Sequence, residues 1–268
     1  MGFVEDLILQ HPCRGMDILR PSLPENFCRE AAEEILCWSR GTVLLTTGFY
    51  VAGHAETDGP PGTLLLAKAL QTQGFRPVVV TDDLCRGYFE RGGIDCTYVA
   101  VGATDDELTA LMAELAPVGM ISVERCGKNV NGDYANMRGI SIAEYTAPVD
   151  RLFALANVPT VGIGDGGNEV GMGNLEEAIR KDLALTPCCI TVDKLVIATV
   201  SNWGALGLCA CMNSLPTASE LEDAYLLAQK MGFVDGVTKE CTLSEDGFSL
   251  DVIRQLLDEM LCGAVSQA

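Results

Sequence analysis

The sequence predicts a three-layer α/β/α protein, in which helices cover both faces of a doubly wound, mostly parallel, Rossmann-like sheet. Short apolar runs alternate with helix-like segments over residues 42–200. This alternation is typical of βαβ units that build a parallel sheet. Two of the apolar runs end directly in loops rich in glycine and acids. We expect those loops at the carboxyl edge of the sheet, where open α/β sheets bind their ligands.

The strands are predicted from apolar or β-branched runs bounded by turn residues. Thr42 to Thr46 (TVLLT) is a clear case, and the run from Val118 to Val123 leads directly into Glu124. In chain order, the predicted strands cover residues 42–46, 77–81, 96–101, 118–123, 158–163 and 194–200.

Helices are predicted between these strands and after the last one. The segment that starts at Thr63 ends at Gly74, a residue typical of helix C-termini. Thr104 and Glu107 match a capping box at the start of another helix. The predicted helices cover residues 63–74, 83–91, 104–116, 148–157, 175–183, an apolar stretch after 204, 219–231 and 249–261.

Composition limits the class of protein. With 268 residues, 48% of them hydrophobic, the chain can bury a sizeable core, and we expect one domain over residues 1–268 with a helical C-terminal portion from about 216. The net charge of −19 argues against nucleic-acid binding, which needs a basic surface. No apolar run reaches the ~18 residues of a membrane span, and the N-terminus lacks a signal-peptide pattern. We therefore expect a soluble, cytoplasmic protein.

Cysteine is frequent, with 12 residues, but none are spaced as Cys-x-x-Cys. His11 and His54 are the two histidines, so a zinc site is poorly supported. A large, core-rich chain does not need a disulfide scaffold. We expect the cysteines to be reduced and mostly to act as small core residues.

The first acid-rich loop follows the strand at 42–46 and contains Glu56 and Asp58 in the run ETDGPPGT. The backbone N–H groups near Gly62 and Thr63 form a helix N-terminus, which can bind an anion. A simple alternative is that Asp58 only caps the loop and the helix start. His54, in the same loop, is a possible base, a ligand or an ordinary polar residue.

The second loop begins at Glu124 and continues to about residue 146. A buried acid at a strand end is unfavourable unless it is paired or bound to a metal. Loops of this length are usually functional or disordered, and this one contains Asn, Gly and Arg rather than a low-complexity run. Its cations suit a carboxylate ligand. The candidate substrate-binding residues here are Arg125, Asp133, Asn136 and Arg138.

The third loop, GIGDGGNEVGMGN at 162–174, has the highest density of glycine and acids. It formally fits G-x-G-x-x-G, but Asp165 and Glu169 would repel a pyrophosphate, so it is a weak dinucleotide motif. Carboxylates on such a loop suit a hard divalent cation better. After the last strand, Asn202 is a candidate substrate ligand and Trp203 a candidate pocket wall, with a capped helix and a core Trp as the alternative.

Four of these segments together resemble the D-glutamate cyclase C-terminal domain family. They are ETDGPPG at 56–62, the run ER-x-G to NMRG at 124–139, IGDGGNE-x-GMG at 163–173 and VSNWG at 200–204. The resemblance covers about residues 2–215 and implies an α/β/α fold. It also implies conversion of D-glutamate to 5-oxo-D-proline with loss of water. In animal members, this domain follows an N-terminal domain that resembles a hydro-lyase, which we do not expect within these 268 residues.

From this resemblance we expect a hydro-lyase that closes a lactam on a small acidic amino acid, assisted by Mg²⁺ or Mn²⁺. The candidate catalytic residues are Glu56, Glu124, Asp165 and Glu169. The candidate metal ligands are Glu56, Asp58, Glu124, Asp165 and Glu169. The candidate substrate-binding residues are Gly62, Thr63, Arg125, Asp133, Asn136, Arg138, Asn168 and Asn202.

Two other functions stay open at this point. The same acids and glycine loops would serve a metal-dependent hydrolase of a small phosphate ester or a lactam. A non-catalytic small-molecule-binding subunit that needs a partner domain is the other alternative. A homodimer is possible, with the apolar helix after Trp203 as its interface.

Overall fold

Six parallel strands form the central sheet of the protein, whose computed structural model describes residues 2–183 and 185–266. The fold predicted from the sequence, a three-layer α/β/α sandwich, is confirmed. The strands are β1 (Thr42–Thr46), β4 (Arg76–Thr81), β5 (Asp95–Tyr98), β6 (Gly119–Val123), β7 (Thr160–Gly164) and β8 (Lys194–Ile197).

The central strands are apolar because both faces of the sheet are covered. In β1, Leu44 lies beside Val78 of β4 on one side and beside Met120 of β6 on the other. All three side chains are buried. Parallel strands covered on both faces are typically continuous apolar runs, as these are.

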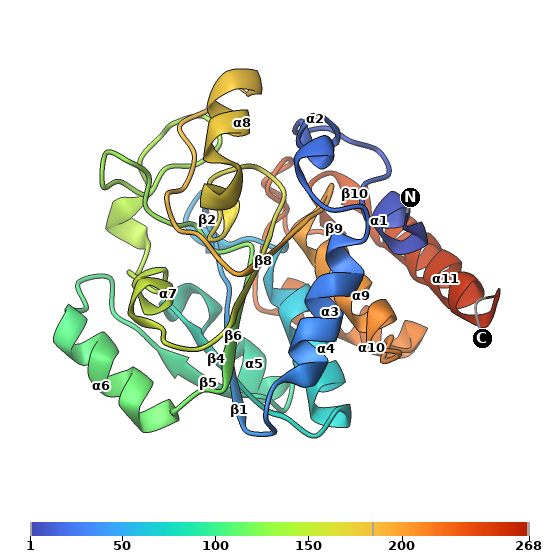
Figure 1. Cartoon of the computed structure of the whole chain (residues 1–268), viewed down its shortest axis with the longest axis horizontal. Helices are drawn as coiled ribbons and strands as arrows, with labels where there is room; N and C mark the ends of the chain where they lie inside the picture. The colour runs from blue at the N-terminus through green and yellow to red at the C-terminus, as the bar shows by residue number, and fades with distance from the viewer. Residues whose placement is uncertain (1, 184, 267–268) are drawn as a thin grey trace.

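Helices cover the two faces of the sheet unequally. On one face lie α3 (Phe27–Cys37), α4 (Pro60–Thr72) and α9 (Ser201–Cys211), and on the other lie α6 (Asp105–Leu115) and α7 (Arg151–Leu155) (Figure 1). Outside α4 and α9 pack α10 (Ala218–Lys230) and α11 (Leu250–Ser266), which confirm the helices expected after residue 216. The N-terminal α1 (Phe3–Ile8) packs against α11, so the first and last helices of the described residues are in contact.

The remaining elements are short. They are α2 (Met16–Leu19), α5 (Tyr88–Arg91), α8 (Glu176–Asp182), the 3₁₀ turns at Arg20–Ser22, Asp83–Cys85, Ala143–Tyr145 and Met172–Leu175, and the hairpins β2 (Tyr50–Val51) with β3 (His54–Ala55) and β9 (Ser244–Glu245) with β10 (Phe248–Ser249). The sequence analysis predicted neither hairpin and none of the helices before residue 42.

Local sequence explains the agreement and the differences in the helices. The capping box of Thr104 and Glu107 is present at the start of α6. However, α4 begins at Pro60 rather than Thr63, since proline is well suited to the first helical turn. The helix predicted over 83–91 is divided into a 3₁₀ turn and α5, because Gly87 between them has a positive φ of 86°.

The strand order is β5-β4-β1-β6-β7-β8, so β1 and β6 lie side by side while the chain leaves them in opposite directions. Counted in chain order, this is the 3-2-1-4-5-6 order of doubly wound folds, with a crevice at the carboxyl ends of β1 and β6. In Figure 1, α2, α8 and β2 are gathered at this end of the sheet. The fold therefore places the candidate site above β1, β6 and β7.

Among the described residues 2–183 and 185–266, none of the cysteines forms a disulfide. Within residues 2–183 and 185–266, no helix combines the length and the apolar character that crossing a membrane requires. Whether the chain forms a single domain stays a prediction.

Candidate functional site

The loops after β1, β6 and β7 bring the predicted acids together in a buried cluster. All five predicted metal ligands are buried, and an unpredicted acid, Asp246, joins them from the β9–β10 turn. Carboxylate oxygens lie within 4.8 Å of one another in two groups that share Asp165. The groups are Asp58, Asp165 and Asp246, and Glu124, Asp165 and Glu169.

Four of these acids line a cavity of about 460 Å³. The lining acids are Glu56, Glu124, Asp165 and Glu169. Arg14, Arg138 and Lys239 add positive charge to the lining. The remaining wall is mostly apolar and comes from residues 49–52, the 136–145 segment and Val237.

Glu124 has an unusual backbone conformation, with a φ of +47°. Left-handed backbone is disfavoured for residues other than glycine, and such strain is concentrated at functional sites. The side chain accepts a hydrogen bond of 2.6 Å from the Ser201 hydroxyl. Burial, followed by the charges of Asp165 and Glu169, raises the pKa of Glu124 well above its usual range.

Asp165 is the acid that both groups share, and Arg14 binds it. The Arg14 guanidinium forms ion pairs with Asp165 and Asp246, which joins the N-terminal segment to β7 and to the β9–β10 turn. The other Asp165 oxygen, Oδ1, is buried and accepts no hydrogen bond from the described residues. Burial raises the pKa of Asp165, against the opposing charge of Arg14.

Glu169 and Asn168 line the cavity next to Asp165. The Gly167 N–H donates a 2.7 Å hydrogen bond to Glu169 Oε2. Burial raises the pKa of Glu169, and the backbone hydrogen bonds oppose this rise. The Asn168 amide donates to the Ala135 carbonyl at 3.1 Å, while its buried Oδ1 has no partner among the described residues. Asn168 is therefore placed where the sequence analysis expected it, with an oxygen that can accept from a ligand.

Glu56 and Asp58 are close together but differ in their partners. Both oxygens of Asp58 accept hydrogen bonds from α9, from the Ser201 N–H at 3.0 Å and the Asn202 N–H at 2.8 Å. Asp58 therefore caps α9. The sequence analysis had considered it as a cap of its own loop and of the helix that follows directly in the chain. Glu56 lines the cavity, and burial together with the charges of Asp246 and Asp58 raises its pKa well above the usual range.

Arg125 does not lie in the cavity lining, contrary to its predicted role in binding substrate. Its guanidinium is fully buried and pairs with Asp82 at 2.7 Å. The same group donates to the carbonyls of Gly48 at 2.9 Å and Ala147 at 2.6 Å. These contacts join the sheet to the loop that follows β6, so we assign Arg125 a structural role.

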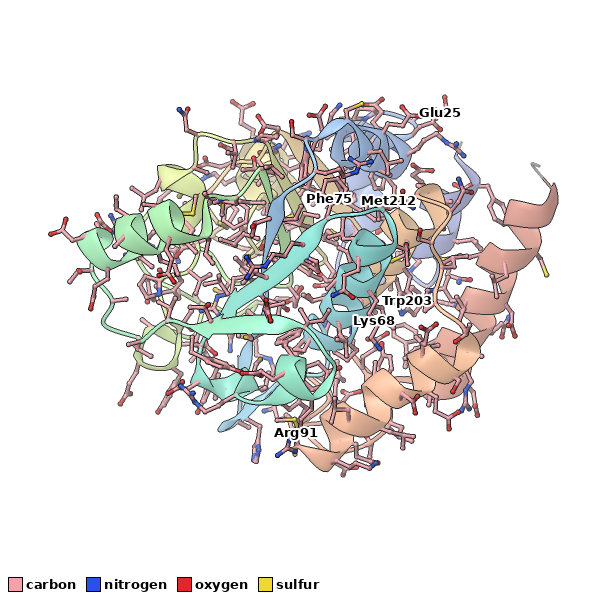
Figure 2. All side chains as sticks on the ribbon, turned by 90° about the horizontal axis from the view of Figure 1, so that it is seen from below. Glu25, Lys68, Phe75, Arg91, Trp203 and Met212 are labelled. Carbon is pink, nitrogen blue, oxygen red and sulfur yellow. The ribbon has the colours of Figure 1, made fainter. Side chains whose placement is uncertain are left out.

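Gly62, Thr63 and Asn202 are also buried away from the cavity. The Asn202 Oδ1 accepts from the N–H groups of Gly59 at 3.0 Å and Gly62 at 2.8 Å, and thereby connects α9 to the start of α4. The Thr63 hydroxyl donates to the Gly59 carbonyl at 2.8 Å. Trp203, whose pocket-wall role was also considered, lies in the core among the helices (Figure 2). The N-terminus of α4, which was predicted to bind an anion, is therefore occupied by the Asn202 side chain.

The predicted substrate-binding residues of the 125–146 loop differ in whether they line the cavity. Asn136 and Arg138 line the cavity, and the Asn136 side chain orders the loop by accepting from the Arg138 and Ile140 N–H groups at 2.9 and 3.1 Å. Asp133 lies outside the lining and accepts a 2.7 Å hydrogen bond from the Ser141 hydroxyl. His54 is exposed in the β2–β3 hairpin and does not line the cavity, which removes it as a candidate base.

Sequence reasoning missed three charged residues of the cluster: Arg14, Glu245 and Asp246. Asp246 has a φ of +48° and is followed by Gly247, a turn pattern with two consecutive acids that could have drawn attention. Arg14 has no such pattern. Glu245 accepts hydrogen bonds of 2.8 Å from the Trp203 indole and 2.5 Å from the Tyr225 hydroxyl.

The donor set fits a hard divalent cation. Carboxylate oxygens are the ligands that Mg²⁺ and Mn²⁺ prefer. The group of Glu124, Asp165 and Glu169 is the better fit, because in the other group both oxygens of Asp58 already accept hydrogen bonds from α9 and Asp246 pairs with Arg14. Glu56 belongs to neither group of close oxygens among the described residues.

Comparison with known proteins places the chain in a family. The family model described as D-glutamate cyclase-like, C-terminal, matches residues 4–261. The chain belongs to this family. The match extends beyond the region that carries the sequence resemblance and includes Asp246, which belongs to one of the two groups of close carboxylates.

A curated relative of this D-glutamate cyclase-like chain is the human (Homo sapiens) protein named D-glutamate cyclase, mitochondrial. It is 30% identical, over 69% of this chain and 34% of the relative. The chain thus spans about a third of the length of that protein. Among solved structures, a mandelate oxidase variant with an FMN adduct covers 97% of this chain and 91% of its own, at 13% identity and a TM-score of 0.25. So low a score carries no argument.

Proposed function

We propose that the protein is a hydro-lyase that converts D-glutamate to 5-oxo-D-proline and water at the acidic cavity. The observation that carries this proposal is the convergence of four buried acids, Glu56, Glu124, Asp165 and Glu169, on one cavity in a chain of the D-glutamate cyclase-like family. The name of the human relative supports the same reaction, although it spans a longer chain.

Positively charged side chains in the cavity lining are available to bind the α-carboxylate of the substrate. Arg138 and Lys239 line the cavity, and both are exposed. Guanidinium groups bind carboxylates in a bidentate manner, so we assign the α-carboxylate to Arg138. This places the γ-carboxyl group toward the acids. Folding the substrate back on itself supplies the orientation that ring closure needs.

A divalent ion held by Glu124, Asp165 and Glu169 would neutralise the γ-carboxylate and polarise its carbonyl carbon. The α-nitrogen then attacks this carbon. In the full reaction the nitrogen loses two protons and the departing oxygen gains two, so water leaves without a net change in protons. Burial raises the pKa of Glu56 well above its usual range, which favours the protonated form and suits Glu56 to donate to the departing oxygen.

The cellular setting is part of the proposal. The many cysteines, none of which forms a disulfide among the described residues, suit a reducing compartment, for which we propose the cytoplasm. The human relative carries a mitochondrial name, which describes that protein. A small acidic amino acid is the proposed partner, and Mg²⁺ or Mn²⁺ the proposed cofactor.

The test is turnover of D-glutamate and L-glutamate to 5-oxoproline by purified protein, with EDTA and then with Mg²⁺ or Mn²⁺. We expect metal-dependent product from the D isomer. Asp165→Ala and Glu169→Ala should each abolish turnover and leave the circular dichroism spectrum unchanged. Unchanged turnover in both variants would remove this loop from the mechanism, and turnover of phosphate esters instead would favour a hydrolase.

A further inference from the structure

One side of the cavity is apolar to a degree that glutamate does not explain. Nine of the 20 lining residues are aliphatic or aromatic: Phe49, Tyr50, Val51, Ala52, Met137, Ile140, Ile142, Tyr145 and Val237. We call them the apolar wall. Between its charged groups, glutamate offers two methylene groups to such a surface. Apolar surface that borders a polar site typically marks a place where a ligand binds.

The apolar wall is supported by its own packing. Phe49 and Ile142 belong to a small hydrophobic cluster, together with Cys126 and Tyr134, that is separate from the main core. The rings of Tyr50 and Tyr145 stack in parallel with centroids 4.0 Å apart, which connects the β2 strand to the 143–145 turn. The wall is therefore a built surface rather than a set of scattered side chains.

The charge of the cavity bears on the group that leaves the γ-carbon. Four acids line the cavity, and Arg14 already pairs with two acids of the cluster. A γ-carboxylate adds a negative charge that the proposed divalent ion must neutralise, whereas a γ-amide adds none. An amide also needs one proton on its departing nitrogen, while a carboxylate oxygen needs two.

We propose that the site acts preferentially on γ-amides of D-glutamate whose amine part carries an aromatic or aliphatic group, with this group on the apolar wall. This inference rests on the proposed cyclisation. The α-nitrogen forms the bond to the γ-carbon, and the bond from that carbon to the amide nitrogen breaks. The α-ammonium nitrogen loses two protons: one goes to the departing nitrogen as the bond breaks, and the second protonates the released amine. The products are 5-oxo-D-proline and the protonated amine.

The experiment compares three substrates at equal metal concentration: D-glutamate, D-glutamine and the γ-benzylamide of D-glutamate. Release of 5-oxoproline gives kcat/KM for each, and benzylamine release confirms the leaving group. We expect the benzylamide to exceed D-glutamine by about tenfold or more, since contacts of one small apolar group change kcat/KM by roughly 10- to 200-fold. Equal values for the benzylamide and D-glutamine would overturn the role of the apolar wall.

A matched pair of variants tests the location. Ile140 in the wall is 58% exposed, and Ile18, outside the lining, is 51% exposed. Ile140→Ser should lower kcat/KM for the benzylamide about tenfold and lower kcat/KM for D-glutamine by less. Ile18→Ser should change neither. Equal losses for both substrates in Ile140→Ser would contradict the inference, and matching melting temperatures would show that both variants fold.

The outcomes separate this inference from the proposed function. Conversion of D-glutamate but of neither amide overturns the inference and keeps the cyclase. Conversion of the benzylamide but not of D-glutamate keeps the inference and overturns the proposed conversion of D-glutamate. If no substrate reacts, thermal stabilisation of the protein by the benzylamide but not by D-glutamine still supports the wall as a binding surface, and no stabilisation by either overturns it.

Discussion

At the scale of single residues, the cavity combines buried acids that are unfavourable for stability with geometry that suits chemistry. Glu124 combines a left-handed backbone, a buried carboxyl group and a pKa raised by burial. Structures keep such residues where function requires them, at the expense of stability.

Replacement of Glu124 by Gly and by Ala should separate backbone strain from the loss of the side chain. Both variants lose the hydrogen bond from Ser201 and should be inactive. Glycine tolerates the φ of +47°, so Glu124→Gly should be more stable than Glu124→Ala by about 1 kcal/mol. Denaturant unfolding measures the difference. An Ala variant as stable as the Gly variant would show that this backbone is unstrained.

Glu245 predicts a dependence of stability on pH. Burial raises its pKa to about 8, against the hydrogen bonds from Tyr225, Asn202 and Trp203. Between the ordinary carboxyl pKa and 8, the unfolded chain releases this proton and the folded chain keeps it. Stability from this group therefore falls as pH rises through that window, by on the order of 2–4 kcal/mol, and is constant above it.

Glu245→Gln should remove this fall. Thermal melts of the wild type and the variant at pH 4 to 9 should converge at the acidic end and diverge toward pH 8. Glu114→Gln, at an exposed position of α6, is the matched control and should follow the wild type. A constant difference between Glu245→Gln and wild type across the range would contradict the assignment.

At the scale of elements, the contact between α4 and α9 holds the floor of the site. A Cβ added at Gly62 would lie 2.4 Å from the Asn202 Oδ1 and 2.8 Å from the Asn202 Cα. The glycine thus allows the two helices to approach closely, and the approach lets Asn202 hold the start of α4. Asp58, on the same loop, caps α9 in return.

Gly62→Ala should therefore destabilise the protein, by about 2 kcal/mol, although alanine favours helix more than glycine does. The reason is the clash with backbone of α9. Gly102→Ala is the control, because an added Cβ there meets nothing within 4 Å. Chemical denaturation of both variants checks the prediction, and a stabilised Gly62→Ala would show that α4 and α9 can separate at no penalty.

At the scale of the whole molecule, the site is assembled from both ends of the chain. Arg14 precedes the first strand, Asp165 follows β7 and Asp246 belongs to the C-terminal portion. The helical portion after residue 216 is thus part of the site. The apolar helix α9 is covered by α3, α4 and α11, which argues against its predicted use in a homodimer. The oligomeric state stays a prediction.

Arg14→Ala should destabilise the protein by about 3 kcal/mol in EDTA, because two buried carboxylates lose their cation. Arg14→Lys should recover part of the loss, since one ammonium does not bridge two carboxylates as a guanidinium does. Mg²⁺ or Mn²⁺ should stabilise Arg14→Ala more than wild type, as measured by the shift in melting temperature. Equal shifts in both proteins would indicate that metal and Arg14 act at independent sites.

The sequence by itself determined the sheet, the order of its helices and the loops that hold Glu56, Glu124, Asp165 and Glu169. These features follow from local patterns, since apolar runs predict buried strands and acids after a strand lie at the carboxyl edge. Only the tertiary structure decided which hydrogen-bond and ion-pair partners the candidate site residues have. It removed Arg125, Asn202, Gly62 and Thr63 from the cavity by satisfying their polar groups within the protein. It added Arg14 at a separation of 151 residues from Asp165, a contact that no local period encodes.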